Sequence, residues 1–220
     1  VLRMKAGATV ILFDGRGGEW RAELFDAKVG AGGTARAALR EFCDRESESP
    51  LAVTLVQVLP SGDKMDWVVE KCVELGIAAI QPIAAQRSVI RLSTERMARR
   101  VSHWNAIAAA ACEQCGRNRV PRVAPVLDLP QYLGAAMAQN ALRLLLTPAA
   151  GTGLRALHAL DGPAGPVVVM VGPEGGWTEG EMLAAQAAGC GLLGLGPRVL
   201  RTETAGAAVL AAMQAVWGDF

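Results

Sequence analysis

Two segments in the C-terminal third constrain the fold of this chain more than any other feature. Residues 167–176 read VVVMVGPEGG, and residues 195–205 read LGPRVLRTETA. In each case an apolar run stops at glycine and proline, and a stretch that can begin a helix follows. Open α/β sheets hold their ligands at the loops that leave the carboxyl ends of parallel strands. Two such loops so close in sequence predict one small-molecule pocket, built largely from main chain.

The chain after Pro50 alternates strand-like and helix-like patterns. Strands are expected at residues 51–59, 79–84, 142–147, 167–172 and 192–195, and helices at 63–75, 94–115, 178–188 and 203–217. Thr178 and Glu181 have the spacing of a capping box, which marks a helix start. The alternation predicts an α/β domain over residues 49–220, with a mostly parallel sheet covered on both faces.

Residues 1–48 follow a different pattern. Short β-like segments at 10–13, 20–29 and 34–44 are separated by glycine-rich stretches. Such spacing is typical of a small β-meander or barrel. We therefore expect a separate small β domain over residues 1–48.

Composition excludes several classes of protein. Of the 220 residues, 51% are hydrophobic and 20% are charged, which supports a sizeable core and excludes a disordered chain. No apolar run reaches the ~18 residues that span a bilayer. The five cysteines are scattered and odd in number, unlike those of a secreted disulfide scaffold. We therefore expect a cytoplasmic protein with no membrane partner.

Two short motifs are not supported by their context. Cys112 and Cys115 form a C-x-x-C pair, but no second pair accompanies them and both histidines are poorly placed to complete a zinc site. We expect no metal, and a core or helix-end role for the pair. Gly189, Gly191 and Gly194 match G-x-G-x-x-G by count. A helix pattern precedes them and a strand follows, the reverse of a dinucleotide-binding motif.

Positive charge is concentrated in one segment. The net charge is +1, yet residues 85–125 hold eight arginines against two glutamates, a local net charge of +6. The expected helix at 94–115 has an apolar stripe and a separate polar face, formed by Arg96, Arg99, Arg100, His103 and Gln114. A solvated basic face is one interpretation. RNA contact is the favoured one, because guanidinium groups fit phosphate geometry.

The C-terminal loops carry one residue that local structure does not explain. Glycines at 172, 175 and 176 allow main chain to approach a ligand, although tight strand-to-helix turns also use glycine. A helix cap explains Thr202. Arg201 lies at the expected start of the last helix, where the helix dipole disfavours a cation. An anion or a polarised oxygen nearby would account for it.

Several segments together resemble one known family. GPEGG at 172–176, LGPRVLRTETA at 195–205 and CEQCGRNRVP at 112–121 are similar to signature segments of the bacterial ribosomal RNA small subunit methyltransferase E family, in the SPOUT superfamily. GDKMDWVVEKCVELG at 62–76 resembles the family's segment after its first strand. The N-terminal module resembles a PUA-like RNA-binding β-barrel domain. Family members normally begin earlier, so we expect this module to be truncated.

The resemblance implies an enzyme and its partners. The activity would be S-adenosylmethionine-dependent methylation of N3 of uridine 1498 in the 16S rRNA of the small ribosomal subunit. A homodimer and a C-terminal trefoil knot are also implied, and the last helix, apolar nearly all round, independently favours a dimer. One alternative is a catalytically inert RNA-binding scaffold. Another is a nicotinamide-dependent enzyme, which the reversed glycine motif disfavours.

The expected cofactor site consists largely of main chain. It comprises Thr147, Pro148, Val171, Gly172, Pro173, Gly175, Gly176, Leu195, Gly196, Leu200, Thr204 and Ala205. Because a sulfonium methyl donor is already activated, the enzyme mainly has to align donor and acceptor. The residues expected to contact RNA are Arg87, Arg96, Gln114, Arg117 and Arg119.

The catalytic candidates are one arginine and three carboxylates. Arg201 ranks first, because it can stabilise negative charge that develops on the uracil oxygens. N3 of uracil carries a proton that must be removed. Glu203 is the next candidate, followed by Glu113 and Glu174, and which of them is the base stays open at this level.

Overall fold

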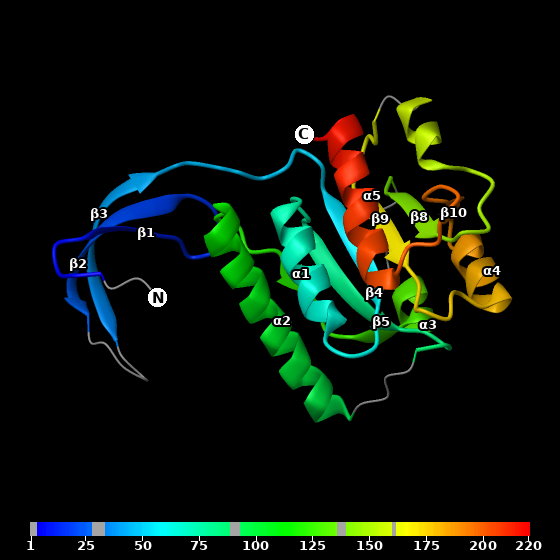
Figure 1. The fold of residues 1–220 in the computed structure, drawn as a ribbon, viewed down its shortest axis with the longest axis horizontal. Coiled ribbons are helices and arrows are strands. Elements are labelled where there is room, and N and C mark those ends of the chain that lie inside the picture. The colour runs from blue at the N-terminus through cyan, green and yellow to red at the C-terminus, as the bar shows by residue number, and fades with distance from the viewer. Residues whose placement is uncertain (1–3, 28–33, 89–92, 136–139, 160–161) are drawn as a thin grey trace. The chain divides into compact units, whose positions relative to one another are not determined.

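The computed structural model of this protein describes residues 4–27, 34–88, 93–135, 140–159 and 162–220 (Figure 1). Its contacts form two compact units. The first consists of Val1–Glu48 and Cys112–Val120, and the second of Ser49–Ala111 and Pro121–Phe220. Residues 112–120 thus make their contacts with the N-terminal segment, whereas the sequence pattern groups them with the α/β domain. The last two residues of the strand expected at 20–29 lie outside the described residues.

The first unit contains a three-stranded antiparallel sheet. Its strands, in the spatial order β1-β2-β3, are β1 (Thr9–Leu12), β2 (Glu19–Ala27) and β3 (Ala35–Cys43). The expected meander is confirmed, and no pairing of β1 with β3 closes it into a barrel among the described residues. Trp20 lies opposite Phe42, with ring centroids 4.9 Å apart. Gly18 has φ +68°, and a Cβ there would overlap the Phe42 ring, so this turn requires glycine.

The second unit is built on a parallel sheet of seven strands among the described residues. Its order is β10-β8-β9-β4-β5-β6, and β7 also pairs with β5. Every pairing in it is parallel, so the predicted mostly parallel sheet is confirmed. The strands are β4 (Val53–Val58), β5 (Ala79–Ala84), β6 (Arg122–Val123), β7 (Leu127–Asp128), β8 (Leu142–Leu146), β9 (Val167–Val171) and β10 (Gly191–Leu193).

The long helices match the sequence expectations closely, while the short helices at 129–134 and 154–159 were not expected. The helices are α1 (Lys64–Glu74), α2 (Thr94–Cys115), α3 (Leu129–Gly134), the 3-10 helix η1 (Leu154–Ala159), α4 (Glu179–Ala187) and α5 (Thr202–Trp217). The Thr178/Glu181 capping box is confirmed at the start of α4. A second capping box, between Asp128 and Gln131, opens the unexpected helix α3.

The alternation of side chains along β4 divides the core into two layers. Leu55 lies under α5, where a Cβ on Gly206 would come within 3.2 Å of its side chain. Val56 points to the opposite face and packs in a cluster with Leu129 of α3 and Ala185 of α4. The central strands β4 and β9 are therefore covered on both sides, which is why β9 reads VVVMV with no polar residue.

Helix α2 presents its apolar stripe to the core, as its periodicity predicts. Trp104 and Ala108 are buried. Two side chains of α2, one of them on its polar face, contact a carboxylate of α1. His103 Nε2 lies 2.8 Å from Asp66 Oδ2 of α1, and Trp104 Nε1 donates to Asp66 Oδ1 over 3.1 Å. His103 was expected on a basic face, but it contacts a carboxylate of the same unit. Among the described helices, none is long and apolar enough to cross a membrane.

Candidate active site

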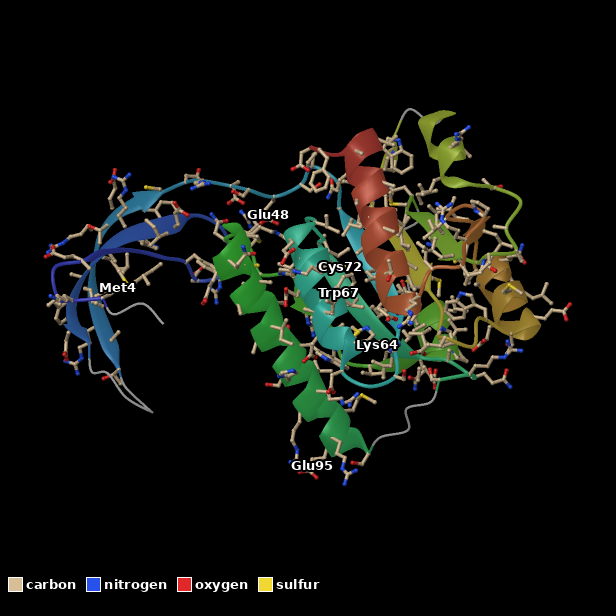
Figure 2. All side chains as sticks on the ribbon, in the orientation of Figure 1. Met4, Glu48, Lys64, Trp67, Cys72 and Glu95 are labelled. Atoms are coloured by element: carbon tan, nitrogen blue, oxygen red, sulfur yellow. The ribbon has the colours of Figure 1, made fainter. Side chains whose placement is uncertain are left out.

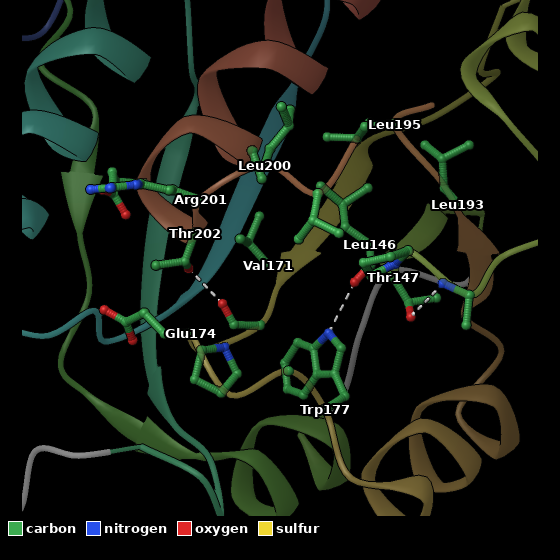
Figure 3. Close-up of a pocket in the computed structure, with 18 of the residues that line it drawn as sticks. Leu146, Thr147, Val171, Glu174, Trp177, Leu193, Leu195, Leu200, Arg201 and Thr202 are labelled. Carbon is green, nitrogen blue, oxygen red and sulfur yellow. Dashed lines mark hydrogen bonds between the residues drawn. The ribbon is translucent and has the colours of Figure 1, made fainter. Parts of the chain in front are cut away.

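A pocket of about 640 Å³ opens at the carboxyl edge of the parallel sheet, in the size range of small-molecule sites (Figure 3). Its walls come from the segments that follow β8, β9 and β10, and from the first residues of α1 and α5. These three strands are close together in the sheet order, so loops that are far apart in the sequence meet. The sequence predicts a pocket at this edge, and the structure contains one.

Most of the residues expected to bind a cofactor line this pocket. Ten of the twelve do so: Thr147, Pro148, Val171, Gly172, Pro173, Gly176, Leu195, Gly196, Leu200 and Ala205. The other two, Gly175 and Thr204, are not part of its wall. The Gly175 carbonyl accepts a hydrogen bond from Arg87 Nη1 over 2.8 Å, and Thr204 lies exposed in the first turn of α5.

The main chain after β10 is well suited to hold a flat polar ring. Within the described part of the chain, no hydrogen bond occupies the N–H or C=O groups of residues 195–200. Leu195, Gly196 and Leu200 of this segment line the pocket beside the apolar side chains of Leu146 and Val171. Main-chain groups without a protein partner bind water or a ligand. An adenosyl group needs this combination of apolar walls and main-chain donors and acceptors.

A hydrogen-bond chain beneath the pocket fixes the start of α5. Thr202 was expected to cap this helix, but Arg201 is the N-cap residue and Thr202 is the first helical residue. Thr202 Oγ1 donates to the Gly172 carbonyl over 2.5 Å and accepts from Gln57 Nε2 over 3.0 Å. Gln57 and Thr202 are both buried. Their hydrogen bonds join β4, the loop after β9 and α5, and sequence reasoning missed the role of Gln57.

Trp177 fixes a second junction of the pocket wall. Its Nε1 donates to the Leu146 carbonyl over 3.1 Å and so links the loop after β9 to the end of β8. A Cβ on Gly172 would lie 2.9 Å from Trp177 Nε1. The glycine at position 172 is therefore required by the packing of an indole, in addition to any approach of a ligand.

One oxygen of the Glu174 carboxylate has several hydrogen-bond partners. Its Oε1 accepts from the Ser61 amide over 2.9 Å and from the Ser61 hydroxyl over 2.7 Å, and lies 3.4 Å from Lys64 Nζ. Burial alone would raise the pKa of Glu174, but these donors outweigh it and lower the pKa to about 2. A carboxylate that holds its charge so firmly is a weak proton acceptor, which counts against Glu174 as a base.

Glu203 has fewer hydrogen-bond partners among the described residues than Glu174 has. It lines the pocket, and its side chain is 15% exposed. Its Oε2 lies 3.5 Å from Lys64 Nζ and is buried without a hydrogen bond to any described residue. Glu113, the remaining candidate, is exposed on α2 and is not among the residues that line this pocket.

Two cations complete the polar end of the pocket. The exposed side chain of Arg201 lines the pocket, and among the described residues nothing forms an ion pair or hydrogen bond with it. Sequence reasoning missed Lys64, although the signal that singled out Arg201 is present there too. Lys64 is the first residue of α1, where the helix dipole also disfavours a cation.

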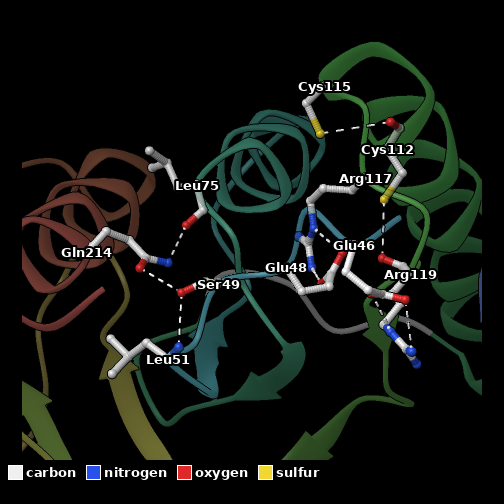
Figure 4. Close-up of polar contacts among 10 residues, drawn as sticks. All are labelled: Glu46, Glu48, Ser49, Leu51, Leu75, Cys112, Cys115, Arg117, Arg119 and Gln214. Carbon is white, nitrogen blue, oxygen red and sulfur yellow. Dashed lines mark hydrogen bonds and ion pairs between the residues drawn. The ribbon is translucent and has the colours of Figure 1, made fainter. Parts of the chain in front are cut away.

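The residues expected to contact RNA fall into different surroundings. Arg96 and Gln114 are exposed on α2. Arg117 is 5% exposed and lies in a bidentate ion pair with Glu48, at 2.5 Å and 3.1 Å (Figure 4). Arg119 is more exposed and forms a bidentate pair with Glu46 at 2.8 Å and 3.0 Å. Both guanidinium groups are thus engaged within the first unit, and their phosphate contacts stay a prediction.

The C-x-x-C pair lies at the end of α2. Burial raises the pKa of Cys112 to about 11, and its Sγ lies 3.6 Å from the Arg119 carbonyl. A thiol with this pKa stays protonated at neutral pH. Among the described residues, no three His, Cys, Asp or Glu side chains come together as metal ligands.

Comparisons with known proteins agree with the geometry. An RNA methyltransferase domain model matches residues 47–214, and an RNA methyltransferase PUA domain model matches residues 1–28. The parallel sheet, the pocket and the two domain matches together define this chain as an RNA methyltransferase. At the level of the family, the ribosomal RNA small subunit methyltransferase E of Synechocystis is 36% identical, over 98% of this chain and 69% of its own length. The chain belongs to the ribosomal RNA small subunit methyltransferase E family.

Solved structures of similar proteins extend this result. A ribosomal RNA small subunit methyltransferase E from Neisseria gonorrhoeae, bound to S-adenosyl methionine, is 40% identical with a TM-score of 0.88. The match covers 99% of this chain and 87% of that one. A putative methyltransferase from Legionella pneumophila, in complex with the same cofactor, is 34% identical with a TM-score of 0.89, covering 99% and 87% of the two chains.

Proposed function

We propose that this chain methylates N3 of uridine 1498 in the 16S rRNA of the small ribosomal subunit, with S-adenosylmethionine as the methyl donor. The observation that carries the proposal is the pocket at the carboxyl edge of the sheet, where unpartnered main chain lies beside apolar walls. Family membership and the cofactor present in two similar structures support the choice of donor.

The described residues fit this cofactor. The main chain of Leu195, Gly196 and Leu200 would be available to hydrogen-bond the adenine, and Leu146 and Val171 would supply apolar contacts to it. When bound, the cofactor would supply a methyl group on a positively charged sulfur: the methyl carbon would bond to the acceptor nitrogen as its bond to sulfur breaks, and the sulfur would leave as a neutral thioether. The chain then has to hold the acceptor nitrogen in line with this methyl group, an effect worth up to ~7–11 kcal/mol.

The polar end of the pocket can handle the proton and the charge of the acceptor base. Glu203 accepts the proton of N3, because it lines the pocket and its Oε2 has no hydrogen bond to any described residue and lies 3.5 Å from the Lys64 ammonium. Arg201 stabilises the negative charge that develops on the uracil oxygens, since no described side chain occupies its guanidinium. Glu174 is assigned a structural role, given its hydrogen bonds to Ser61.

The proposal extends to assembly and substrate docking. We place the dimer interface on α5, whose Thr204, Ala207, Ala208 and Ala211 form a partly exposed strip of small side chains. The N-terminal domain at 1–48 is proposed to be PUA-like and to dock RNA together with Arg87, Arg96 and Gln114. A trefoil knot formed by the C-terminal loops, and a cytoplasmic location, complete the proposal.

Methylation of small subunits that lack the modification tests the proposal. The purified protein and labelled S-adenosylmethionine should produce one labelled nucleoside, identified by mass spectrometry as 3-methyluridine. Calorimetry should show binding of S-adenosylmethionine and of S-adenosylhomocysteine, but not of NAD. Binding of RNA without binding of the methyl donor would favour an inert scaffold instead.

A further inference from the structure

Lys64 occupies a position that helix electrostatics disfavours. It is the first residue of α1, at the positive end of the helix dipole. Its ammonium nevertheless lines the pocket, 3.4 Å from Glu174 Oε1 and 3.5 Å from Glu203 Oε2. Figure 2 shows Lys64 at the N-terminal end of α1, next to the first turn of α5. Two carboxylates from two other elements thus offset the unfavourable dipole and tie these elements together.

The two carboxylates that contact Lys64 differ in what they can still accept. Glu174 Oε1 already receives two hydrogen bonds from Ser61 as well as the ammonium. Glu203 Oε2 is buried and has the ammonium alone, with no hydrogen bond to a described residue. An ionised carboxylate oxygen has lone pairs for about two donors. Glu203 Oε2 is therefore held by Lys64 alone among the described donors, while Glu174 Oε1 is held by Ser61 and in turn holds Lys64.

We propose that Lys64 is a positioning residue, which holds the Glu203 carboxylate in the place and orientation needed to take the proton from the acceptor nitrogen. The proton moves from N3 to the Glu203 carboxylate, whose residue lines the pocket, and Lys64 keeps all three of its own protons. Glu174, which accepts two hydrogen bonds from Ser61, contacts the same ammonium and anchors it. The inference rests on the proposed function, in which Glu203 is the proton acceptor.

Lys64→Met tests the inference, because it removes the charge and keeps most of the side-chain length. The assay is the single-turnover methylation rate on unmodified small subunits at saturating donor, together with the affinity for S-adenosylhomocysteine. We expect the rate to fall about 30- to 100-fold while the affinity changes less than about threefold. Lys64→Arg should restore the rate to within about fivefold of the original protein. Should the methionine variant not fold, Lys64→Gln carries the same test.

Lys71 provides a matched control. It lies in the same helix and also bridges two carboxylates, with Nζ 2.6 Å from Glu70 and 2.9 Å from Glu74, but it is not part of the pocket wall. Lys71→Met should leave the single-turnover rate unchanged. If Lys64→Met had no larger effect on the rate than Lys71→Met, the inference would be overturned.

A double-mutant cycle separates positioning from general structural damage. Glu203→Gln alone should lower the rate strongly, and adding Lys64→Met should then cost less than about twofold more, because Lys64 acts through Glu203. Multiplicative losses would overturn the inference. A failure of the proposed function is distinguishable, since the unaltered protein would then neither bind the donor nor methylate the subunit.

Discussion

Thr202→Val gives the sharpest test of how the pocket is held together. The substitution keeps the shape of the side chain and removes the hydroxyl that joins Gln57 to the Gly172 carbonyl. Thr202 is 6% exposed and Gln57 is fully buried, so water cannot easily replace the lost partner. A buried group left without its hydrogen bond costs about 1–3 kcal/mol. The substitution leaves one donor, Gln57 Nε2, and one acceptor, the Gly172 carbonyl, without this partner. We therefore expect the free energy of unfolding to fall by about 2–4 kcal/mol.

Urea unfolding followed by circular dichroism measures this change, and calorimetry with S-adenosylhomocysteine measures its effect on the pocket. Thr202→Ser keeps the hydroxyl and should lose only about 1 kcal/mol for the missing methyl group. Thr54→Val is the matched control: it makes the same chemical change in β4, at a half-buried residue whose side chain makes no hydrogen bond to a described residue. We expect that control to stay within about 0.5 kcal/mol of the original protein. Equal stability of Thr202→Val and Thr202→Ser would refute the reasoning.

Three further predictions follow from the ion pairs and the pocket. Arg201→Ala should lower the single-turnover rate about 100-fold and leave RNA affinity within about twofold, as filter binding can check. Arg117→Ala should destabilise the protein by about 3 kcal/mol in urea unfolding, because it leaves Glu48 without its partner, and an effect on RNA affinity alone would contradict the buried ion pair. The pKa of Glu174 is lowered to about 2 in the folded protein, so the stability from its bonds to Ser61 is present above its ordinary pKa and is lost as pH falls toward 2. Its side chain is 34% exposed, so Glu174→Gln should cost only about 1 kcal/mol at pH 7 and almost nothing near pH 2, and a gap that widened on acidification would contradict this.

The fold could largely be predicted from local patterns, because periodicity and capping act within a few residues. The strand at 79–84 and the helix at 94–115 agree with the structure to the residue. The short elements β6, β7 and α3 were not predicted, since strands of two residues have no periodicity. The start of α3 had a readable signal in the Asp128/Gln131 capping box, with Pro130 in its first turn.

The sequence by itself determined the longer strands, the long helices and the loops that line the pocket, because glycine, proline and apolar runs act locally. Only the tertiary structure decided which charged side chains pair within the protein and which can contact a ligand in the pocket. Arg117 and Glu48 are 69 residues apart, and Ser61 and Glu174 are 113 residues apart, yet each pair forms hydrogen bonds. Those contacts engage Arg117, a candidate for RNA binding, and Glu174, a candidate base. Glu203 and Arg201 line the pocket. The physical reason is that an ion pair depends on distance in space, which a one-dimensional pattern does not contain.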